Sequence, residues 1–298
     1  MKKEIDELKM GEELYRCQRL VDERLSGFFS SKATYRRLMD SMRYSLLAGG
    51  KRIRAVLCVK FCEAAGGDWE NALDAACAIE MLHTYSLIHD DLPCMDDDDL
   101  RRGKPSNHIE FGESTAVLAG DALLAASFET LLDCGAPSAT VVKMGKVLAH
   151  SAGAHGICGG QYLDLSGESK SIRYDELVET HLLKTAALMS ASAKLGVILA
   201  DGSQEQLAAA EEYALAVGLA FQIRDDMLDR AATSEAIGKP VGSDIEKGKT
   251  TFAALFSENE CEAMIRAQTD KADSAIFGKF GHTDFLMWFA RYLAERES

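Results

Sequence analysis

The pattern of apolar and polar residues along the chain predicts helices almost throughout. Amphipathic segments at residues 4–29 and 33–47 are followed by apolar runs at 55–65 and 72–88. The last run is apolar around nearly the whole helical circumference, which is typical of a buried helix. No sustained alternation of apolar and polar residues indicates strands, and good helix formers such as Ala, Leu and Glu dominate the chain. We therefore expect an all-α protein.

The rest of the chain continues this helical pattern. Apolar and amphipathic runs predict helices over residues 112–150, 172–200 and 204–229, and two or three more up to Ser298. The sequence contains no linker, internal repeat or low-complexity tract. Residues 1–298 are therefore expected to form a single domain with a sizeable core.

Two of the apolar helices end in aspartates. The helix 204–229 carries Asp225 and Asp229, which lie four residues apart and so share one helical face. Asp90 and Asp96 follow the helix 72–88, but on an unbroken helix they would point about 120° apart. Pro93 must therefore break that helix if both aspartates are to share a cation. Oxygen ligands that lie close together and near phosphate favour Mg²⁺.

Several polar side chains lie in apolar surroundings, and the roles of some of them allow two interpretations. His83 precedes Asp90 by seven residues, so it lies on the same face about 10 Å away, either as a ligand contact or as a satisfied core histidine. Lys184 is flanked by apolar residues and either extends to solvent or holds an anion. A helix that begins after the glycines near Gly160 would direct Gln161 and Asp164 inward.

Basic residues gather in three separate places. They are Lys51–Arg54, Arg101–Lys104, and a glycine- and lysine-rich segment at 231–250. Burying cations costs free energy unless an anion pairs with them, so each group could bind an anionic ligand. The alternative for each group is a solvated loop. With two carboxylate groups and an apolar interior, these cations indicate a ligand that has a diphosphate head and a hydrocarbon tail, and a second anionic substrate. The hypothesis is ionisation of one diphosphate in a dry cavity and attack by the other substrate.

Composition narrows the choice of partners and location. The net charge of 33 − 47 = −14 argues against nucleic acid and anionic membranes as main partners. Eight scattered cysteines without a C-x-x-C pair indicate buried thiols rather than zinc or disulfides. The N-terminal residues lack the apolar region of a secretory signal, and no run of 18 apolar residues predicts a membrane span. We expect a cytoplasmic protein.

Seven short motifs resemble those of the short-chain trans-prenyl diphosphate synthases. In order they are Gly49-Gly50-Lys51-Arg52-Ile53-Arg54, Asp90-Asp91-Leu92-Pro93-Cys94-Met95-Asp96, Arg101-Arg102-Gly103, Gly159-Gly160-Gln161, Lys184-Thr185, Phe221-Gln222 with Asp225-Asp226-Met227-Leu228-Asp229, and Gly238-Lys239-Pro240. Together they cover about residues 30 to 255. The resemblance implies an isoprenoid-synthase helical barrel around a central apolar cavity, usually as a homodimer. It also implies condensation of isopentenyl diphosphate with an allylic diphosphate.

The same resemblance implies roles for individual residues. Three Mg²⁺ ions per active site would be held by Asp90, Asp96 and Asp225, with Asp91, Asp226 and Asp229 completing the two aspartate motifs. The allylic diphosphate would be bound by Arg101, Lys184, Lys239 and Lys249, and its cation would lie near Thr185 and Gln222. Isopentenyl diphosphate would be bound beside Gly50 by Lys51, Arg54, His83 and Arg102.

Product length depends on the residues before the first aspartate, which in this family help to form the floor of the tail tunnel. Ser86 is too small to block the tunnel, whereas Tyr85 resembles the residue of the farnesyl type, which makes a C15 product. The DDLPCMD motif also occurs in geranylgeranyl synthases, so a C20 product is the alternative. Because of Tyr85, we expect the C15 product.

Three other functions share part of this pattern. A terpene cyclase has the same fold but needs no second diphosphate site, and a non-catalytic partner subunit would be expected to have lost one aspartate motif. The pair His89-Asp90 alone could indicate a metal phosphohydrolase, but the other histidines show no supporting pattern. The two complete motifs and the separate basic groups favour prenyl transfer.

Overall fold

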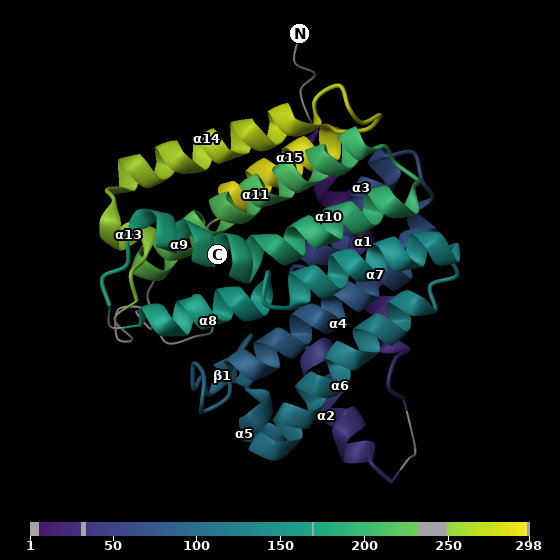
Figure 1. The fold of residues 1–298 in the computed structure, drawn as a ribbon, viewed down its shortest axis with the longest axis vertical. Coiled ribbons are helices and arrows are strands. Elements are labelled where there is room, and N and C mark those ends of the chain that lie inside the picture. The colour runs from purple at the N-terminus through teal and green to yellow at the C-terminus, as the bar shows by residue number, and fades with distance from the viewer. Residues whose placement is uncertain (1–5, 31–33, 169, 232–248, 297–298) are drawn as a thin grey trace.

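Helices make up nearly all of the secondary structure in the computed structural model, which describes residues 6–30, 34–168, 170–231 and 249–296 (Figure 1). In chain order they are α1 (Glu7–Ser26), α2 (Arg36–Leu46), α3 (Ile53–Ala64), α4 (Leu73–Asp90), α5 (Asn107–Phe111), α6 (Glu113–Leu132), α7 (Ser138–Ala152), α8 (Ile157–Gly167), α9 (Tyr174–His181), α10 (Ala187–Leu199), α11 (Gln204–Ala231), α13 (Phe252–Leu255), α14 (Glu258–Ile276) and α15 (Asp284–Ala294).

Two short helical turns and a hairpin complete this list. A 3₁₀ turn, η1 (Trp69–Ala72), precedes α4, and a π-helical turn, η2 (Leu182–Ala186), joins α9 to α10. The strands β1 (Leu100–Arg101) and β2 (Lys104–Pro105) pair antiparallel as a tight hairpin. The prediction of an all-α protein is confirmed.

One predicted helix differs from the structure. The single helix expected over 112–150 was wrong, because α6 and α7 are separated at Asp133–Pro137. Gly135 there has φ +75°, which ends a helix, and Pro137 precedes the first residue of α7. Ahead of α4, the carboxylate of Asp68 accepts the backbone N–H of Glu70 at 3.0 Å and so caps η1, which leads into the longer helix.

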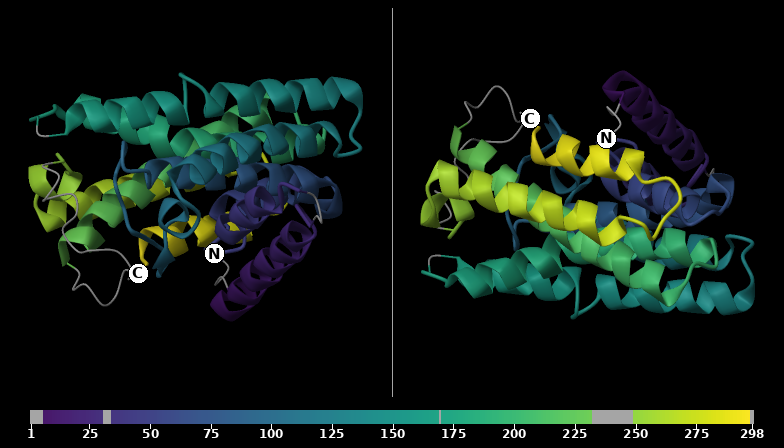
Figure 2. Two further views of the ribbon diagram at one scale, coloured as in Figure 1. Left: turned by 90° about the horizontal axis from the view of Figure 1, so that it is seen from below. Right: turned by 90° about the horizontal axis from the view of Figure 1, so that it is seen from above.

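Two central helices organise the core. α4 packs against α3 and α6, and α10 packs against α3, α7 and α11. Their faces carry many small residues, so the backbones approach closely; a Cβ added to Gly196 of α10 would lie 2.2 Å from the carbonyl oxygen of Cys58 on α3. The C-terminal helices α14 and α15 lie along α11 (Figure 2). A smaller apolar cluster, which includes Leu177, Leu219 and Phe252, joins α9, α11 and α13.

Within the described parts of the chain, two helices are long and apolar enough, by length and composition alone, to cross a membrane. They are α6 and the continuous helix Tyr174–Leu199, and 39% and 61% of their most apolar windows are buried inside the protein. Core helices of soluble proteins pass the same test, and here α6 packs on α4 while α10 packs on α3.

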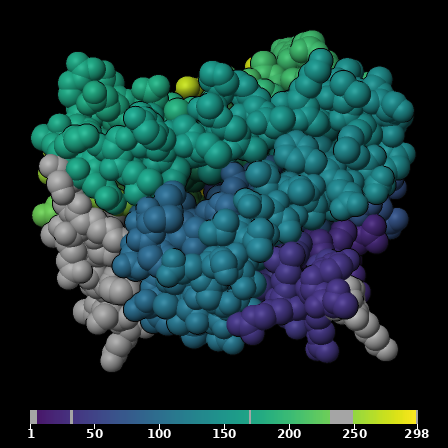
Figure 3. Space-filling view, turned by 60° about the horizontal axis from the view of Figure 1, so that its bottom comes forward, coloured from purple at the N-terminus to yellow at the C-terminus, as the bar shows by residue number. Residues whose placement is uncertain are grey.

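The blue and teal segments, from the hairpin to α8, form most of the face shown in Figure 3.

The close approach of α10 to α3 gives a test of the packing. We expect Gly196→Ala to lower the free energy of unfolding by about 1–3 kcal/mol, because the added methyl group has no space. Gly145→Ala in α7 is the control: nothing lies within 4 Å of its added Cβ, so the substitution should leave stability unchanged or raise it by about 0.5–1 kcal/mol. Urea unfolding of both variants measures this, and equal stabilities would contradict the packing described.

Candidate functional site

A sharp turn after α4 brings the first group of aspartates together. The helix ends at Asp90, and the backbone N–H of Asp96 then donates to the carbonyl oxygen of Asp90 at 2.8 Å. The expected break at Pro93 is thus confirmed. Burial raises the pKa of Asp90 to about 6; Lys184 opposes this shift, while Asp96 and Asp91 add to it. Crowded, buried carboxylates of this kind favour a nearby cation.

Two lysines supply positive charge to these aspartates. Nζ of Lys184 lies 2.7 Å from a carboxylate oxygen of Asp164 on α8, and Nζ of Lys249 lies 2.9 Å from the same oxygen. Lys249 also reaches Asp96 at 3.2 Å. Burial alone would raise the pKa of Asp164, but the two lysines lower it to about 2. We refer to Asp90, Asp96, Asp164, Lys184 and Lys249 as the aspartate–lysine network.

The network is positioned by the π turn η2, which carries Lys184 and Thr185. Turns of this kind are rare and are frequent at functional sites. Two glycines let neighbouring helices touch its backbone: a Cβ on Gly160 of α8 would lie 2.1 Å from the amide nitrogen of Lys184, and one on Gly218 of α11 would lie 2.6 Å from Cβ of Ala186. The predicted motifs around Gly160 and Lys184 therefore meet in space.

The second aspartate motif lies on α11, on the other side of η2. The hydroxyl of Thr185 donates to the side-chain oxygen of Gln222, which lies one turn before Asp225. Since Lys184 interacts with Asp90 while the adjacent Thr185 bonds Gln222, both aspartate helices end around the same turn. The adjacent residues Lys184 and Thr185 therefore connect both aspartate helices to η2, while joint metal binding by Asp90 and Asp225 stays a prediction.

The three aspartates of the second motif have different surroundings. Asp225 is 41% exposed and forms an ion pair with Arg296, whose guanidinium also lies 3.7 Å from the centre of the Phe221 ring. Asp226 is buried and accepts the backbone N–H of Phe252 at 2.7 Å, so it anchors the start of α13. Asp229 lies one turn beyond Asp225 and is partly buried. Asp225 is therefore partly accessible to a ligand, whereas Asp226 is held by the backbone ahead of α13.

A separate basic cluster forms where Gly49–Arg54 meets the hairpin. Nη1 of Arg54 lies 3.3 Å from Nε2 of His83, and Nε of Arg54 is buried with no hydrogen-bond partner among the residues described. Arg102 donates to the carbonyl of Gly49 and lies against Gly50, where φ is +123° and an added Cβ would be 2.7 Å from the guanidinium carbon. Only glycine fits there.

The electrostatics of this cluster favour an anion. Burial lowers the pKa of Arg54 to about 10. Arg102 adds to this lowering, whereas Glu80 opposes it. Burial and the neighbouring Arg296 also lower the pKa of Lys51, against the pull of Asp225. Burial, together with Arg54 and Arg102, lowers the pKa of His83 well below its ordinary value, so this imidazole is neutral. An anionic ligand would relieve the repulsion between these groups.

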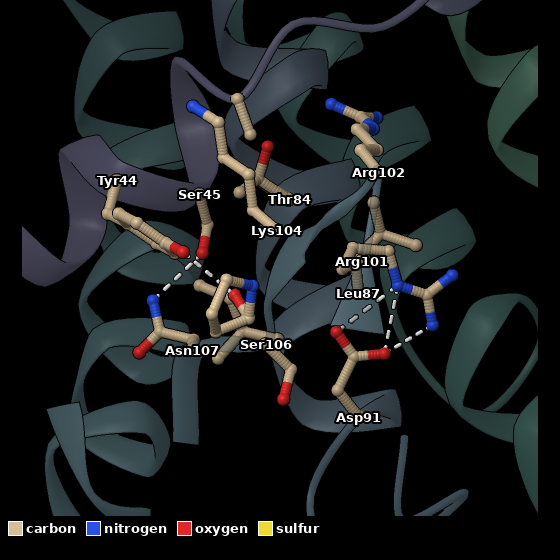
Figure 4. A pocket seen from close by; sticks show the side chains of 13 residues that line it. Tyr44, Ser45, Thr84, Leu87, Asp91, Arg101, Arg102, Lys104, Ser106 and Asn107 are labelled. Carbon is tan, nitrogen blue, oxygen red and sulfur yellow. Dashed lines mark hydrogen bonds and ion pairs between the residues drawn. The ribbon is translucent and has the colours of Figure 1, made fainter. Parts of the chain in front are cut away.

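Arg101 and Asp91 form a buried ion pair between this cluster and the network (Figure 4). Nε of Arg101 lies 2.9 Å from Oδ1 of Asp91, and Asp98 lies 3.4 Å from the same guanidinium. The pair lines a small pocket with Tyr44, Lys104 and Asn107. Burial lowers the pKa of Arg101, but Asp91 outweighs this effect and leaves it raised. Asp91 therefore orients Arg101 in this structure, while the metal contact inferred for it remains a prediction.

The chain-length candidates both lie on the buried part of α4. Tyr85 is 5% exposed, and its hydroxyl lies 3.7 Å from Sγ of Cys158 on α8. The hydroxyl of Ser86 donates to the carbonyl of His83 at 2.9 Å. Lys239, another predicted diphosphate ligand, lies outside the described residues.

Motif matching missed two residues of the site. Asp164 carries no role in the predicted set, although its inward position on α8 was expected. Arg296 was not considered, because nothing in a lone arginine at the end of an amphipathic segment signals a partner on α11.

The carboxylates that the structure brings together suit Mg²⁺. No group of three or more His, Cys, Asp or Glu side chains in the described ranges is arranged to hold a metal ion. Mg²⁺ is usually bound by one or two carboxylates together with substrate phosphates rather than by an all-protein cage. Asp90 and Asp96 on one side of η2 and Asp225 on the other offer hard oxygen donors in that sparse arrangement. The residues present therefore fit the ion.

Comparison with known proteins identifies the family. Residues 35–276 match the polyprenyl synthetase family. The chain belongs to that family. It is accordingly a prenyltransferase, and it has the isoprenyl synthase helical fold.

Curated relatives of this prenyltransferase include geranylgeranyl synthases of plants. The chloroplastic geranylgeranyl pyrophosphate synthase of Capsicum annuum is 48% identical over 263 residues, which cover 87% of this chain and 71% of that protein. The large subunit 1 of the heterodimeric geranylgeranyl pyrophosphate synthase of Arabidopsis thaliana is 43% identical over 271 residues, covering 88% and 73%.

Solved structures of similar proteins cover almost the whole chain. Geranylgeranyl pyrophosphate synthetase from Pyrococcus horikoshii Ot3 has a TM-score of 0.88 at 32% identity, covering 97% of this chain and 100% of that one. An FPP/GFPP synthase from Zymomonas mobilis has a TM-score of 0.85 at 33% identity, covering 96% and 99%. Geranyltransferase from Helicobacter pylori, complexed with magnesium and isoprenyl diphosphate, has a TM-score of 0.82 at 30% identity, covering 95% of each chain.

The raised pKa of Asp90 gives a test of the site in the metal-free prenyltransferase. The pKa of this carboxyl is 3.8 in the unfolded chain and about 6 in the folded protein. Ionisation of Asp90 therefore lowers the free energy of unfolding progressively between about pH 4 and 6, and the full loss is present above that range. We expect Asp90→Asn, measured in a chelator, to be about 1–3 kcal/mol more stable than wild type at pH 8. The difference should shrink towards pH 4. A variant less stable than wild type at pH 8 would contradict the burial described.

Proposed function

We propose that this prenyltransferase condenses isopentenyl diphosphate with an allylic diphosphate. The observation that carries the proposal is the aspartate–lysine network facing the second aspartate motif across η2, with a separate basic cluster beside it. The network would bind the diphosphate that leaves, and the cluster of Lys51, Arg54 and Arg102 would bind the diphosphate that stays. A terpene cyclase has no use for that second cationic cluster.

The chain's own residues account for each part of this reaction. Lys184 and Lys249 would stabilise the charge that develops on the departing diphosphate, since fixed cations in a buried site need no reorganisation. The hydroxyl of Thr185 on η2 and the side-chain oxygen of Gln222 on α11 lie together beside Lys184, where the allylic cation would form. The double bond of isopentenyl diphosphate would then attack C1 of that cation, and the proton that is lost would pass to the released diphosphate.

Magnesium is part of this proposal. When bound between the diphosphate and Asp90, Asp96 and Asp225, Mg²⁺ would neutralise phosphate charge and make the diphosphate a better leaving group. The complex of the Helicobacter pylori relative with magnesium supports its use here, and the count of three ions remains a prediction.

For the product, we propose the C20 diphosphate, because the curated relatives at 43–48% identity are geranylgeranyl synthases. This reverses the preference for C15 that the sequence analysis based on Tyr85. The C15 product remains the second candidate, since Tyr85 is large, buried and five residues before Asp90, and a relative from Zymomonas mobilis is an FPP/GFPP synthase.

Assembly and location stay predictions from the sequence. The homodimer implied by the family resemblance is one arrangement, and the Arabidopsis thaliana relative belongs to a heterodimeric enzyme. The cytoplasmic location likewise stays a prediction.

The network predicts which lysine of the long helix matters. Lys184→Ala should lower kcat by about 10²–10³-fold, because the developing charge loses a fixed cation. The control Lys194→Ala removes a lysine ten residues further along, which pairs with Glu211 on α11, and should leave kcat within about twofold. Steady-state assays with Mg²⁺ measure both, with circular dichroism to check folding. Equal losses in the two variants would contradict the assignment.

The two aspartate motifs predict a second loss of activity. Asp90→Ala and Asp225→Ala should each reduce turnover by at least about 10²-fold while the helical circular dichroism is retained, since both side chains act on the ligand rather than on packing. Incubation with Mg²⁺, labelled isopentenyl diphosphate and geranyl diphosphate measures the condensed product. Wild-type protein that forms no condensed product would favour the cyclase or partner-subunit interpretation.

Tyr85 decides between the two product lengths. If the ring closes the apolar end of the site, Tyr85→Ala should lengthen the product by at least one isoprene unit, as read by chromatography of the dephosphorylated alcohols. An unchanged product would show that another residue forms the floor.

A further inference from the structure

The contact between Tyr85 and Cys158 joins two helices that carry the site. The hydroxyl oxygen of Tyr85 lies 3.7 Å from Sγ of Cys158, within hydrogen-bonding distance for sulfur. Figure 1 shows α8 beside the C-terminal half of α4, so the contact lies between these two helices. Tyr85 is buried but Cys158 is exposed. The thiol therefore touches a buried ring on one side and borders open space on another.

The pair lies next to the aspartate–lysine network. Tyr85 precedes Asp90 by five residues; burial raises its pKa, and Cys158 and the Asp90 carboxylate add to the shift. On α8, Cys158 lies six residues before Asp164, which binds both network lysines. The pair therefore lies within two helical turns of the network, measured along both α4 and α8.

Gln161 indicates independently that this side of α8 faces a ligand. It is 7% exposed, and neither its amide nitrogen nor its amide oxygen has a hydrogen-bond partner among the residues described. A buried amide left without partners is costly, so such groups usually meet a ligand or water. Gln161 lies one turn after Cys158, and residues three apart are neighbours on a helix surface.

We propose that Cys158 is a specificity-determining residue that, by holding the hydroxyl of Tyr85, sets how far a growing prenyl chain can extend between α4 and α8. This inference rests on the proposed function. The ring of Tyr85 is restrained from one direction by His89, whose ring centre lies 5.7 Å away edge-on, and from another by the thiol. Loss of the thiol would free the ring and remove the volume of the sulfur, whereas a larger apolar residue would fill the space.

The product distribution of three variants tests this proposal. With isopentenyl diphosphate, geranyl diphosphate and Mg²⁺, Cys158→Ala should raise the ratio of longer to shorter product by about two- to fivefold, as expected for the loss of one weak contact. Cys158→Leu should lower that ratio. Cys158→Ser keeps a hydroxyl of similar size beside Tyr85 and should retain the wild-type distribution. The readout is a ratio of products, which a general loss of stability would not shift in opposite directions.

A double-mutant comparison isolates the contact itself. Tyr85→Phe should shift the ratio in the same direction as Cys158→Ala, and the double variant should shift it no further than either alone. Cys134→Ala, at the end of α6, is the control and should change nothing. Active wild type with unchanged Cys158 variants would overturn this inference alone, whereas inactive wild type would overturn the proposed function as well.

Discussion

Mutual neutralisation of buried carboxylates and lysines is the constraint on which the site depends. A buried charge is costly unless it is paired, and removing one partner leaves the other uncompensated. Asp164 is held between Lys184 and Lys249, while Asp90 and Asp96 crowd against the same cations. Four segments must therefore assemble together: the end of α4, the middle of α8, the turn η2, and Lys249 ahead of α13.

Small residues let this charged centre form inside an apolar bundle. Gly160 and Gly218 allow α8 and α11 to touch the backbone of η2, and Gly196 allows α10 to lie directly on α3. Helices packed this closely cannot shift independently. The backbone position of Lys184 is therefore fixed by the packing of α8 and α11 against η2. The apolar interior and the polar centre are thus parts of one packing arrangement.

The sequence predicted elements and motifs well, because both depend on local spacing. Helical periodicity and the break at Pro93 agree with the structure, and both aspartate helices connect to η2. Spacing could not reveal tertiary partners. Asp91 and Asp226 read as members of aspartate motifs, yet one is paired with Arg101 and the other binds the amide of Phe252. The break between α6 and α7 was missed because the surrounding Ala-rich composition continues the helical pattern on both sides of Gly135.

The π turn also limits how this segment can change in length. Such a turn accommodates one residue more than an α-helical turn, so a single-residue deletion within Leu182–Ala186 would allow a regular helix to form through it. α9 and α10 would keep nearly their present relative orientation, because the turn already absorbs the extra residue, but side chains within η2 would shift by one helical position, and Lys184 would leave the carboxylates it neutralises. Substitutions in η2 act on one contact at a time, whereas a deletion there would displace Lys184 and Thr185 together from Asp164 and Gln222.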